Sequence, residues 1–289
     1  MQIENCSFEY DSPIAPKTTF KIGGMAKRVA MPHTEKALGE LICELSKSGE
    51  KYTVLGNGSN VLFMGDYDGT LVLTKKLCDV CVNGEFVSAL CGALVTSVSS
   101  RARDEGLSGM EFAYGIPGSI GGGVYMNAGA YGGALSDIVY ESKAIDKDGR
   151  LVTVLAKDHA FGYRDSAFMH NGLTVVSTTL KLQRGDKEQI SALMEDYMQR
   201  RKDKQPLDKP SAGSVFKRGD GFITAQVIDR CGLKGLRVGD AQVSEKHAGF
   251  IVNLGSATGG DVLRLVEKVK EEVLRMEGKE LECEIRIIR

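Results

Sequence analysis

Eight glycines fall between Gly115 and Gly133, and this stretch carries the clearest chemical signal in the sequence. Glycine lets a ligand approach the main chain, and successive N–H groups in such a loop can form a concave site for an anion, typically a phosphate. The interspersed Tyr125, Asn127 and Tyr131 argue against a flexible linker, which would consist mostly of glycine and serine. The stretch therefore indicates a phosphate-binding loop, with an ordered, tightly packed turn region as the alternative.

A second candidate ligand loop, Gly56–Asn60, follows an expected strand at 52–55. Neither loop matches the common nucleotide signatures, because the sequence has no G-x-G-x-x-G after a strand and no G-x-x-x-x-G-K-[ST]. Phosphate recognition would therefore use another design, in which two loops are held rigid by the elements beside them.

Basic residues gather within 200–204, at the end of an expected helix, and again at 217–218. Between them, the small residues at 211–213 would let a ligand reach the hydroxyl of Ser214. A hydrolase nucleophile is poorly supported, since no G-x-S-x-G is present. The basic residues are candidates for contact with a phosphorylated ligand, and a solvated helix end favoured by the helix dipole is the alternative.

The cysteines favour neither a metal site nor a disulfide framework. Cys78 and Cys81 form a C-x-x-C pair, but structural zinc needs four ligands, and no second pair of cysteines or histidines stands at a suitable spacing. A cysteine pair at a strand edge or in the core is the better interpretation. Seven scattered cysteines suit a reducing compartment, so we expect a cytoplasmic protein without a metal.

Length and charge bound the function further. A chain of 289 residues can form two or three compact units. A net charge of −1 gives no electrostatic reason to expect nucleic acid or an anionic membrane as a partner. The beginning of the chain lacks the basic start and apolar run of a secretory signal, and no apolar run approaches the roughly 20 residues that span a bilayer.

Hydrophobic periodicity and turn signals predict mixed helices and strands. Thr34 is expected to cap a helix that ends before Gly49, and Asp148 and Gly149 indicate a hairpin turn. The pattern predicts further helices at 94–105, 186–202, 223–231 and from 258 or 261 to 278. It predicts strands at 52–55, 71–74, 86–90, 144–146, 151–155, 173–182, 249–253 and along the alternating residues 280–287.

Six segments in this order resemble one family of flavoenzymes. They are 19–24 (TFKIGG), 55–60 (LGNGSN), 115–133, 161–166 (FGYRDS), 210–217 (PSAGSVFK) and 243–253 (VSEKHAGFIVN). Their order and spacing resemble the UDP-N-acetylenolpyruvoylglucosamine reductases, the MurB family, from about residue 17 to the end of the chain. The form of the 210–217 segment resembles the shorter, type II, members.

This resemblance implies an α+β fold. It implies a two-lobed FAD-binding domain of the vanillyl-alcohol-oxidase (PCMH) type, at 1–78 and 79–185, and a C-terminal α/β substrate-binding domain at 186–289. It also implies non-covalent FAD, NADPH as the hydride donor, and reduction of the enolpyruvyl group of UDP-N-acetylglucosamine enolpyruvate to UDP-N-acetylmuramate, a peptidoglycan precursor. The only partner implied is this small UDP-sugar, bound by a monomer in the cytoplasm.

Family roles carry over by position. Ser214 matches the serine that gives a proton to a substrate carbon, Arg164 and Glu284 match the pair that stabilises the enolic intermediate, and Tyr163 matches a tyrosine that contacts substrate. We expect Arg201, Lys204 and Lys217 to bind the substrate. The expected cofactor-binding residues are Leu55, Gly56, Asn57, Gly58, Ser59, Asn60, Gly115, Pro117, Gly118, Ser119, Ile120, Gly121, Gly122, Asn127 and Gly132.

Three positions depart from the family pattern: Arg218 and Gly219 stand where Asn and Pro are frequent, and Cys283 stands where Pro is common. They put in doubt the shape of the substrate loop. Two alternative functions stay open at this point. One is a related FAD-dependent oxidase of alcohols or hydroxy acids, which would not need Ser214; the other is a nucleotide-sugar binding protein without catalysis.

Overall fold

The computed structural model describes residues 2–289, which divide into two compact units. The first unit consists of residues 2–10, Arg28–Asn57 and Gly69–Arg200. The second consists of Asp11–Lys27, Gly58–Asp68 and Arg201–Arg289. Two short segments from the N-terminal part of the chain thus belong with the C-terminal unit, and the loop at 55–60 is divided between the units.

The N-terminal strands form a four-stranded sheet of order β1-β2-β5-β3. The order along the chain is β1 (Cys6–Pro13), β2 (Met25–Pro32), α1 (Glu35–Ser48), β3 (Tyr52–Leu55) and β5 (Tyr67–Leu73). As predicted, the Thr34 side chain accepts the N–H of Ala37 at the start of α1, and Gly49 ends the helix in the left-handed conformation. The expected strand at 71–74 starts earlier, at Tyr67, and ends at Leu73.

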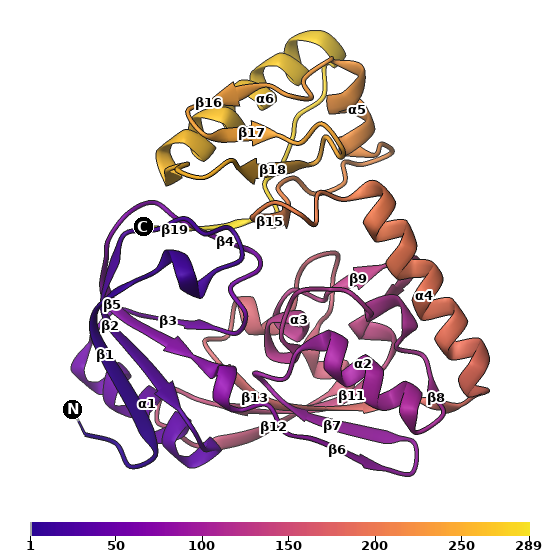
Figure 1. Cartoon of the computed structure of the whole chain (residues 1–289). Helices are drawn as coiled ribbons and strands as arrows, with labels where there is room; N and C mark the ends of the chain where they lie inside the picture. The colour runs from indigo at the N-terminus through magenta and orange to yellow at the C-terminus, as the bar shows by residue number, and fades with distance from the viewer. Residues whose placement is uncertain (1) are drawn as a thin grey trace. The chain divides into compact units, whose positions relative to one another are not determined.

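A five-stranded antiparallel sheet of order β12-β11-β13-β7-β6 lies in the first unit. Its strands are β6 (Val80–Asn83), β7 (Phe86–Leu90), β11 (Val139–Ile145), β12 (Leu151–Leu155) and β13 (Thr174–Lys181). Helices α2 (Val95–Asp104) and α3 (Ile120–Tyr125) cover one face of it (Figure 1). The predicted hairpin joins β11 to β12, with Gly149 in the left-handed region at φ 78°.

Short elements complete the first unit. They are β8 (Leu107–Ser108), β9 (Gly129–Ala130), β10 (Gly133–Ala134) and β14 (Gln183–Arg184), with short 3-10 helices at Thr74–Lys76, Glu111–Ala113, Leu135–Asp137, Ala156–His159 and Ala167–Met169. The long helix α4 (Lys187–Lys204) follows, and its last four residues are counted with the second unit.

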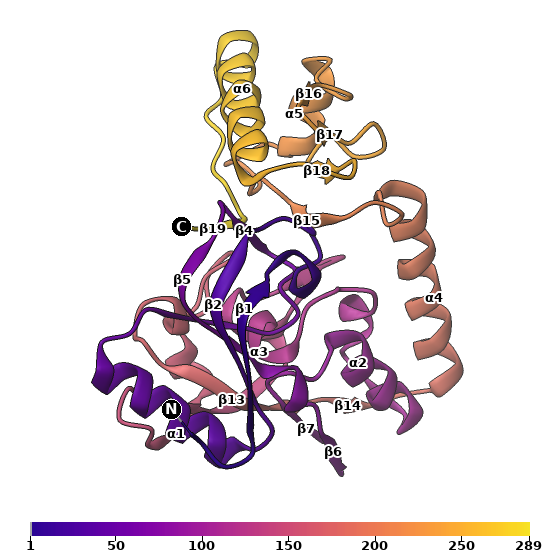
Figure 2. The same ribbon diagram turned by 60° about the vertical axis from the view of Figure 1, so that its left-hand side comes forward.

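The second unit contains a four-stranded sheet of order β15-β18-β17-β16. Its elements are β15 (Ser211–Ser214), α5 (Thr224–Arg230), β16 (Arg237–Val238), β17 (Ala241–Val243), β18 (Phe250–Asn253) and α6 (Gly259–Glu277). Helix α6 packs along this sheet beside α5 (Figure 2). The capping box of Thr258 and Asp261 begins α6, and its buried face of valines and leucines forms the core with the sheet.

The last predicted strand is largely wrong. Residues 280–287 were expected to form one alternating strand, but β19 covers only Arg286–Ile288 and pairs in parallel with β4 (Val61–Phe63). Leu281 and Ile285 are buried as the alternation predicts. The period of two shows which side chains face the core, but it does not show how many residues form backbone hydrogen bonds with a neighbouring strand. A 3-10 helix at Ala15–Lys17 completes the second unit.

Candidate active site

Ser214 and Glu284 come from segments that pair with each other in the second unit. The N–H of Glu284 donates to the carbonyl of Val215 at 2.7 Å, and the N–H of Lys217 donates to the carbonyl of Glu282 at 2.9 Å. Phe216 and Cys283 face each other across this short antiparallel bridge. The backbone therefore brings two of the three predicted catalytic residues to neighbouring positions.

Strand β15 presents Ser214 at its end. Ser214 pairs with Phe250 of β18, and the register shifts between Ser211 and Ser214. Gly213 lies in this irregular stretch at φ 76°, and a Cβ at this position would meet no atom within 4 Å. The space beside Gly213 is thus open, whereas Ala212 before it is buried. The N–H of Val215 donates to Gly249 at 2.8 Å and fixes the strand end.

Asn60 connects the 58–60 segment of the second unit to Glu284. Its Nδ2 donates to the main-chain carbonyl of Glu284 at 3.2 Å, and its own carbonyl accepts the N–H of Arg286 at 3.0 Å. The bond from Arg286 belongs to the parallel pairing of β4 with β19, and the bond from Nδ2 adds a side-chain contact just before that pairing begins. We had predicted Asn60 as a cofactor residue, and no sequence signal indicated this contact with a residue 224 positions away.

Arg164 lies in the first unit, on a turn between Gly162 and Asp165. Its φ of 55° is in the left-handed region, which few residues other than glycine adopt. The guanidinium Nη2 donates to the carbonyl of Gly129 at 3.1 Å, and Nη1 to that of Asn127 at 3.5 Å. Tyr163 beside it is 52% exposed, and its ring lies 5.2 Å from the guanidinium carbon.

The two glycine-rich loops meet in the first unit. Asn57 Nδ2 donates to the carbonyl of Pro117 at 2.6 Å. A Cβ at Gly56 would lie 1.8 Å from the hydroxyl oxygen of Ser119, so only glycine permits this approach. Ser119 also caps α3 by accepting the N–H of Gly122. Residues predicted from two separate motifs therefore form one surface.

Within that surface, some glycines serve packing and others leave the main chain open. The N–H groups of Ile120 and Gly121 donate to Ala93 and Cys91, and a Cβ at Gly121 would lie 2.7 Å from the Cys91 Cβ. The packing alternative therefore holds for Gly121. Gly122 is exposed, and Gly132, at φ 90°, has no atom within 4 Å of a Cβ position. These two leave backbone that a ligand can approach.

In the second unit, Gly58 makes the corresponding close approach. It lies at φ 62°, and a Cβ would be 2.8 Å from the carbonyl oxygen of Lys17. Its carbonyl accepts the N–H of Thr19, the first residue of the 19–24 motif. The open glycines and tight loop contacts fit the requirements of a dinucleotide whose phosphates lie against main chain. FAD is therefore compatible with the residues present.

The basic residues of 200–204 and 217 differ in their burial and in their ion pairs. Arg200 pairs with Asp196 at 2.7 Å, and Lys217 Nζ pairs with Glu282 at 2.5 Å. Arg201 is only 6% exposed, whereas Lys204 is exposed. The predicted substrate contacts Arg201, Lys204 and Lys217 all belong to the second unit, but they have different surroundings.

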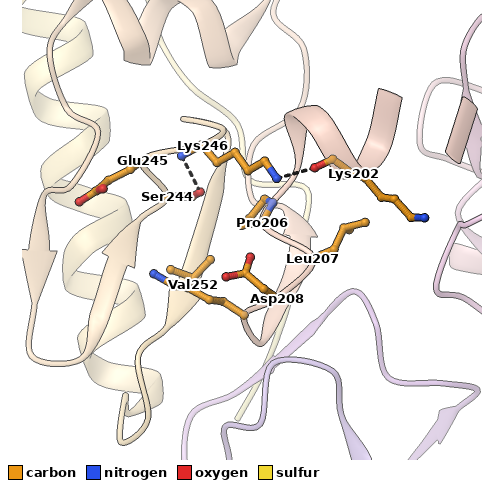
Figure 3. Close-up of a pocket in the computed structure, with 9 residues that line it drawn as sticks. Lys202, Pro206, Leu207, Asp208, Ser244, Glu245, Lys246 and Val252 are labelled. Carbon is orange, nitrogen blue, oxygen red and sulfur yellow. Dashed lines mark hydrogen bonds between the residues drawn. The ribbon is translucent and has the colours of Figure 1, made fainter. Parts of the chain in front are cut away.

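A pocket of about 480 Å³ lies in the second unit at the end of α4 (Figure 3). Lys202, Lys209 and Lys246 contribute to its lining, together with the carboxylates of Asp208 and Glu245. The charges do not converge: the Lys202 ammonium points away, and Lys246 Nζ donates to the main-chain carbonyl of Lys202 (Figure 3). Lys246 thus satisfies a carbonyl at the helix end, where cations are favourable.

One departure from the family pattern, Gly219, has a local explanation. The ring of Phe222 lies on Gly219, where a Cβ would be 1.9 Å from the ring. A larger residue at 219 would displace this ring. Cys283 is half-buried opposite Phe216, and burial raises the pKa of its thiol. Arg218 is exposed.

The C-x-x-C pair and the helices were the remaining candidates for a metal site and a membrane span. Cys78 and Cys81 are exposed free thiols. Across residues 2–289, no three His, Cys, Asp or Glu side chains come together in a way that could hold a metal ion. Nor does any helix in this part of the chain combine the length and apolar character needed to cross a membrane.

Two family models match the chain. The model of an FAD binding domain matches residues 26–155, and the model of the UDP-N-acetylenolpyruvoylglucosamine reductase C-terminal domain matches residues 205–288. The first covers both loops of the surface around Ser119, and the second covers Ser214 and Glu284.

Curated relatives match over nearly the whole chain. UDP-N-acetylenolpyruvoylglucosamine reductase of Pseudothermotoga lettingae is 42% identical over 99% of this chain and 100% of its own length. The reductase of Clostridium novyi is 43% identical over 94% of this chain and 89% of its own. The crystal structure of the Thermus caldophilus reductase (MurB) superimposes with a TM-score of 0.85 at 34% identity, over 98% of this chain and 99% of that one. The chain therefore belongs to the UDP-N-acetylenolpyruvoylglucosamine reductase family, with the α+β fold that the sequence predicted.

Proposed function

We propose that this chain is an FAD-containing, NADPH-dependent reductase. It reduces the enolpyruvyl group of UDP-N-acetylglucosamine enolpyruvate and forms UDP-N-acetylmuramate, a peptidoglycan precursor. The observation that carries this proposal is the backbone pairing that sets Ser214 beside Glu284, in a chain related to these reductases over its full length. An oxidase of alcohols or hydroxy acids would not need this pair.

The cofactor residues that we propose lie on the two glycine-rich loops. Gly56, Asn57, Gly115 and 117–122 in the first unit, and Gly58–Asn60 in the second, would hold FAD, together with Leu55 and Gly132. When bound, FAD supplies the hydride chemistry, and the protein supplies position and electrostatics. The support for this set is the close contact of the loops around Ser119 and the open main chain at Gly122 and Gly132.

Arg164 is proposed to hold the carboxylate of the enolpyruvyl group. A guanidinium has a planar fork of N–H donors that matches the two oxygens of a carboxylate. Negative charge develops next to this carboxylate as the alkene is reduced, and a preorganised donor at such a position contributes about 3 kcal/mol. Tyr163, beside Arg164, is the proposed neighbouring substrate contact.

Ser214 is proposed to give its hydroxyl proton to the substrate carbon that carries this charge. A serine hydroxyl is a weak acid, but an enolate is basic enough to take its proton. General acid catalysis of this kind contributes roughly 10²- to 10⁴-fold in rate. Glu284 would stabilise the same charge in its protonated form, because a carboxylate would repel it.

The substrate diphosphate is proposed to contact Arg201, Lys204 and Lys217. The support is modest: all three lie in the second unit, and Lys217 follows Ser214 closely on the same segment. Its ion pair with Glu282 must be exchanged for the diphosphate. We also propose a monomer in the cytoplasm, a location supported by seven free thiols.

The three-part organisation also stands as a proposal. The strands of the N-terminal sheet lie within 1–78, those of the five-stranded sheet within 79–185, and those of the β15–β18 sheet within 186–289. The support is this correspondence of one sheet to each part.

The experiment is a spectroscopic assay of the purified, flavin-loaded chain. NADPH consumption should begin when UDP-N-acetylglucosamine enolpyruvate is added, and UDP-N-acetylmuramate should accumulate in equal amount. A chain that oxidises simple alcohols or hydroxy acids with oxygen, and that leaves the enolpyruvyl substrate unchanged, would overturn the proposal.

A further inference from the structure

Asn127 belongs to the glycine-rich segment, and its side chain contacts protein groups on both sides. Its Nδ2 donates to the carbonyl of Gly162 at 2.8 Å, and its Oδ1 accepts the N–H of Ser136 at 2.9 Å. The residue is only 8% exposed. Gly162 is the first residue of the turn that carries Arg164. The amide therefore connects the glycine-rich segment to this turn instead of facing a ligand.

The main chain around Asn127 contacts the arginine directly. The carbonyl of Asn127 and that of Gly129 accept hydrogen bonds from the two terminal nitrogens of Arg164, at 3.5 and 3.1 Å. A guanidinium is planar and has five N–H donors, so these two carbonyl contacts orient its plane. The segment at 127–129 thus determines both the position of the turn and the orientation of the guanidinium.

The backbone of this region needs such support. Asn127 and Arg164 both lie in the left-handed region, at φ 42° and 55°. Asparagine tolerates this conformation, whereas arginine rarely adopts it. Strained residues persist only where their surroundings hold them. Here two side chains hold the turn to the segment before it: Asn127 through Gly162, and Ser166, whose hydroxyl donates to the carbonyl of Tyr125 at 2.8 Å.

We propose that Asn127 is a positioning residue for Arg164: its amide holds the 162–165 turn so that the guanidinium is oriented for the substrate carboxylate. This inference rests on the proposed function, in which Arg164 acts on the enolpyruvyl substrate. It replaces the expectation that the Asn127 side chain binds the cofactor. A cofactor-binding side chain would affect the flavin and hence both halves of the reaction. A positioning residue for Arg164 would affect only the half in which the substrate is reduced.

The test compares two glycine substitutions at left-handed asparagines. Asn127→Gly removes the amide, and glycine adopts the native φ without strain. Asn5→Gly is the matched control, since Asn5 has φ 56°, belongs to the same unit and is exposed. Four quantities are measured on each flavin-loaded protein. They are the flavin content, the midpoint of thermal unfolding, the rate of flavin reduction by NADPH, and the rate of the following reaction with the enolpyruvyl substrate.

The inference predicts that Asn127→Gly slows the substrate reaction on the order of 10- to 100-fold, as expected for a misplaced catalytic group. Flavin content and reduction by NADPH should stay within about twofold of the unmodified protein, and Asn5→Gly should change none of these rates. In an Arg164→Ala background, Asn127→Gly should have no further effect, because both act through one group. Three results would overturn the inference: loss of flavin from Asn127→Gly, equal slowing of flavin reduction and of the substrate reaction, or additive effects of Asn127→Gly and Arg164→Ala.

A second variant covers the case in which Asn127→Gly unfolds. Asn127→Asp keeps the acceptor for Ser136 and loses the donor to Gly162. It should reproduce the selective loss in the substrate reaction, and a substrate rate equal to that of the unmodified protein would contradict the inference. If instead the proposed function is wrong, the result is different. The reduced flavin of the unmodified protein would then not react with the enolpyruvyl substrate.

Discussion

Arg164 and the Ser214–Glu284 pair are held in place by different means. Arg164 lies on a strained turn of the first unit, and side-chain hydrogen bonds from Asn127 and Ser166 hold that turn. Ser214 and Glu284 lie on extended segments of the second unit, where main-chain hydrogen bonds hold both. The position of Arg164 therefore depends on a few side chains, and that of the pair depends mainly on the backbone.

This difference predicts where substitutions do harm. A main-chain ladder survives the loss of one neighbouring side chain, because each of its hydrogen bonds is made by groups that every residue except proline carries. A turn held by an amide loses its geometry when that amide is removed. Neighbours of Arg164 should therefore be less tolerant of substitution than neighbours of Glu284.

Apart from Ser214, the largest effect is expected at Glu284. Glu284→Ala should lower the rate of the substrate reaction on the order of 10²- to 10³-fold, as for the loss of one donor at developing charge. Glu284→Gln retains an N–H donor and should lose less, because the acting form is protonated. Rapid-mixing measurement of the substrate reaction checks this. If Gln is as harmful as Ala, the proposed role of a protonated carboxyl is wrong.

A smaller effect is expected at Lys204. Charge reversal by Lys204→Glu should weaken binding of the UDP-sugar about tenfold and leave reduction of the flavin by NADPH nearly unchanged, because an exposed charge in water contributes about 1 kcal/mol. The Michaelis constant for the substrate is the measurement, and Lys268→Glu on the exposed side of α6 is the control. Unchanged substrate affinity would remove Lys204 from the diphosphate site.

Asn60→Ala offers the most direct comparison of the two regions. It removes the hydrogen bond to the Glu284 carbonyl but leaves the pairing of 215–217 with 282–284 intact. We expect the substrate reaction to slow only about two- to fivefold, in keeping with one net hydrogen bond of about 1 kcal/mol. The same assay as for Asn127→Gly applies. A larger loss for Asn60→Ala than for Asn127→Gly would reverse the comparison.

The smallest effect concerns stability and pH. His159 is fully buried in the first unit: its Nδ1–H donates to the carbonyl of Leu155 at 2.8 Å, and its Nε2 accepts the Ser142 hydroxyl at 2.9 Å. Burial lowers the pKa of His159 below 6.5, the usual value of a histidine. The unfolded chain therefore binds a proton at this histidine more readily than the folded chain does. The contribution of neutral His159 to the free energy of unfolding is complete above pH 6.5 and is lost as the pH falls through the lowered pKa.

His159→Gln should remove this pH dependence, and hydrogen exchange can assign it to one unit. In the unmodified protein, amides of β11 and β13 should lose protection as the pH falls below 6.5, after correction for intrinsic exchange rates, while those of β17 and β18 should not. Two results would show that His159 does not cause the pH dependence: equal loss of amide protection in both units, or the same dependence of protection on pH in His159→Gln as in the unmodified protein.

Local signals in the sequence predicted much of the fold. Thr34 and Gly49 predicted both ends of α1, and Asp148 with Gly149 predicted the β11–β12 turn. Apolar residues three and four positions apart predicted α6. These features depend on neighbouring residues, and the sequence shows them directly. The interleaving of the two units could not be predicted in this way, because it depends on which distant segments pack together.

The site shows the same limit. Residue types and family motifs indicated Ser214, Arg164 and Glu284, but not what holds them. Asn60 and Asn127 read as cofactor residues because they stand in glycine-rich loops, yet their amides contact main-chain groups 224 and 35 positions away. The final strand was wrong for a related reason: the alternation of 280–287 is real, but only Arg286–Ile288 find a parallel partner in β4.

The central claim is that Ser214 serves the substrate half of the reaction and has no part in the first half. The direct measurement is anaerobic: flavin-loaded Ser214→Ala is reduced with NADPH and then mixed with the enolpyruvyl substrate. We predict that the visible flavin absorbance is lost at the rate of the unmodified protein, and that product formation after mixing is slower by roughly 10²- to 10⁴-fold. Equal slowing of both steps, or product formation at the unmodified rate, would contradict the account.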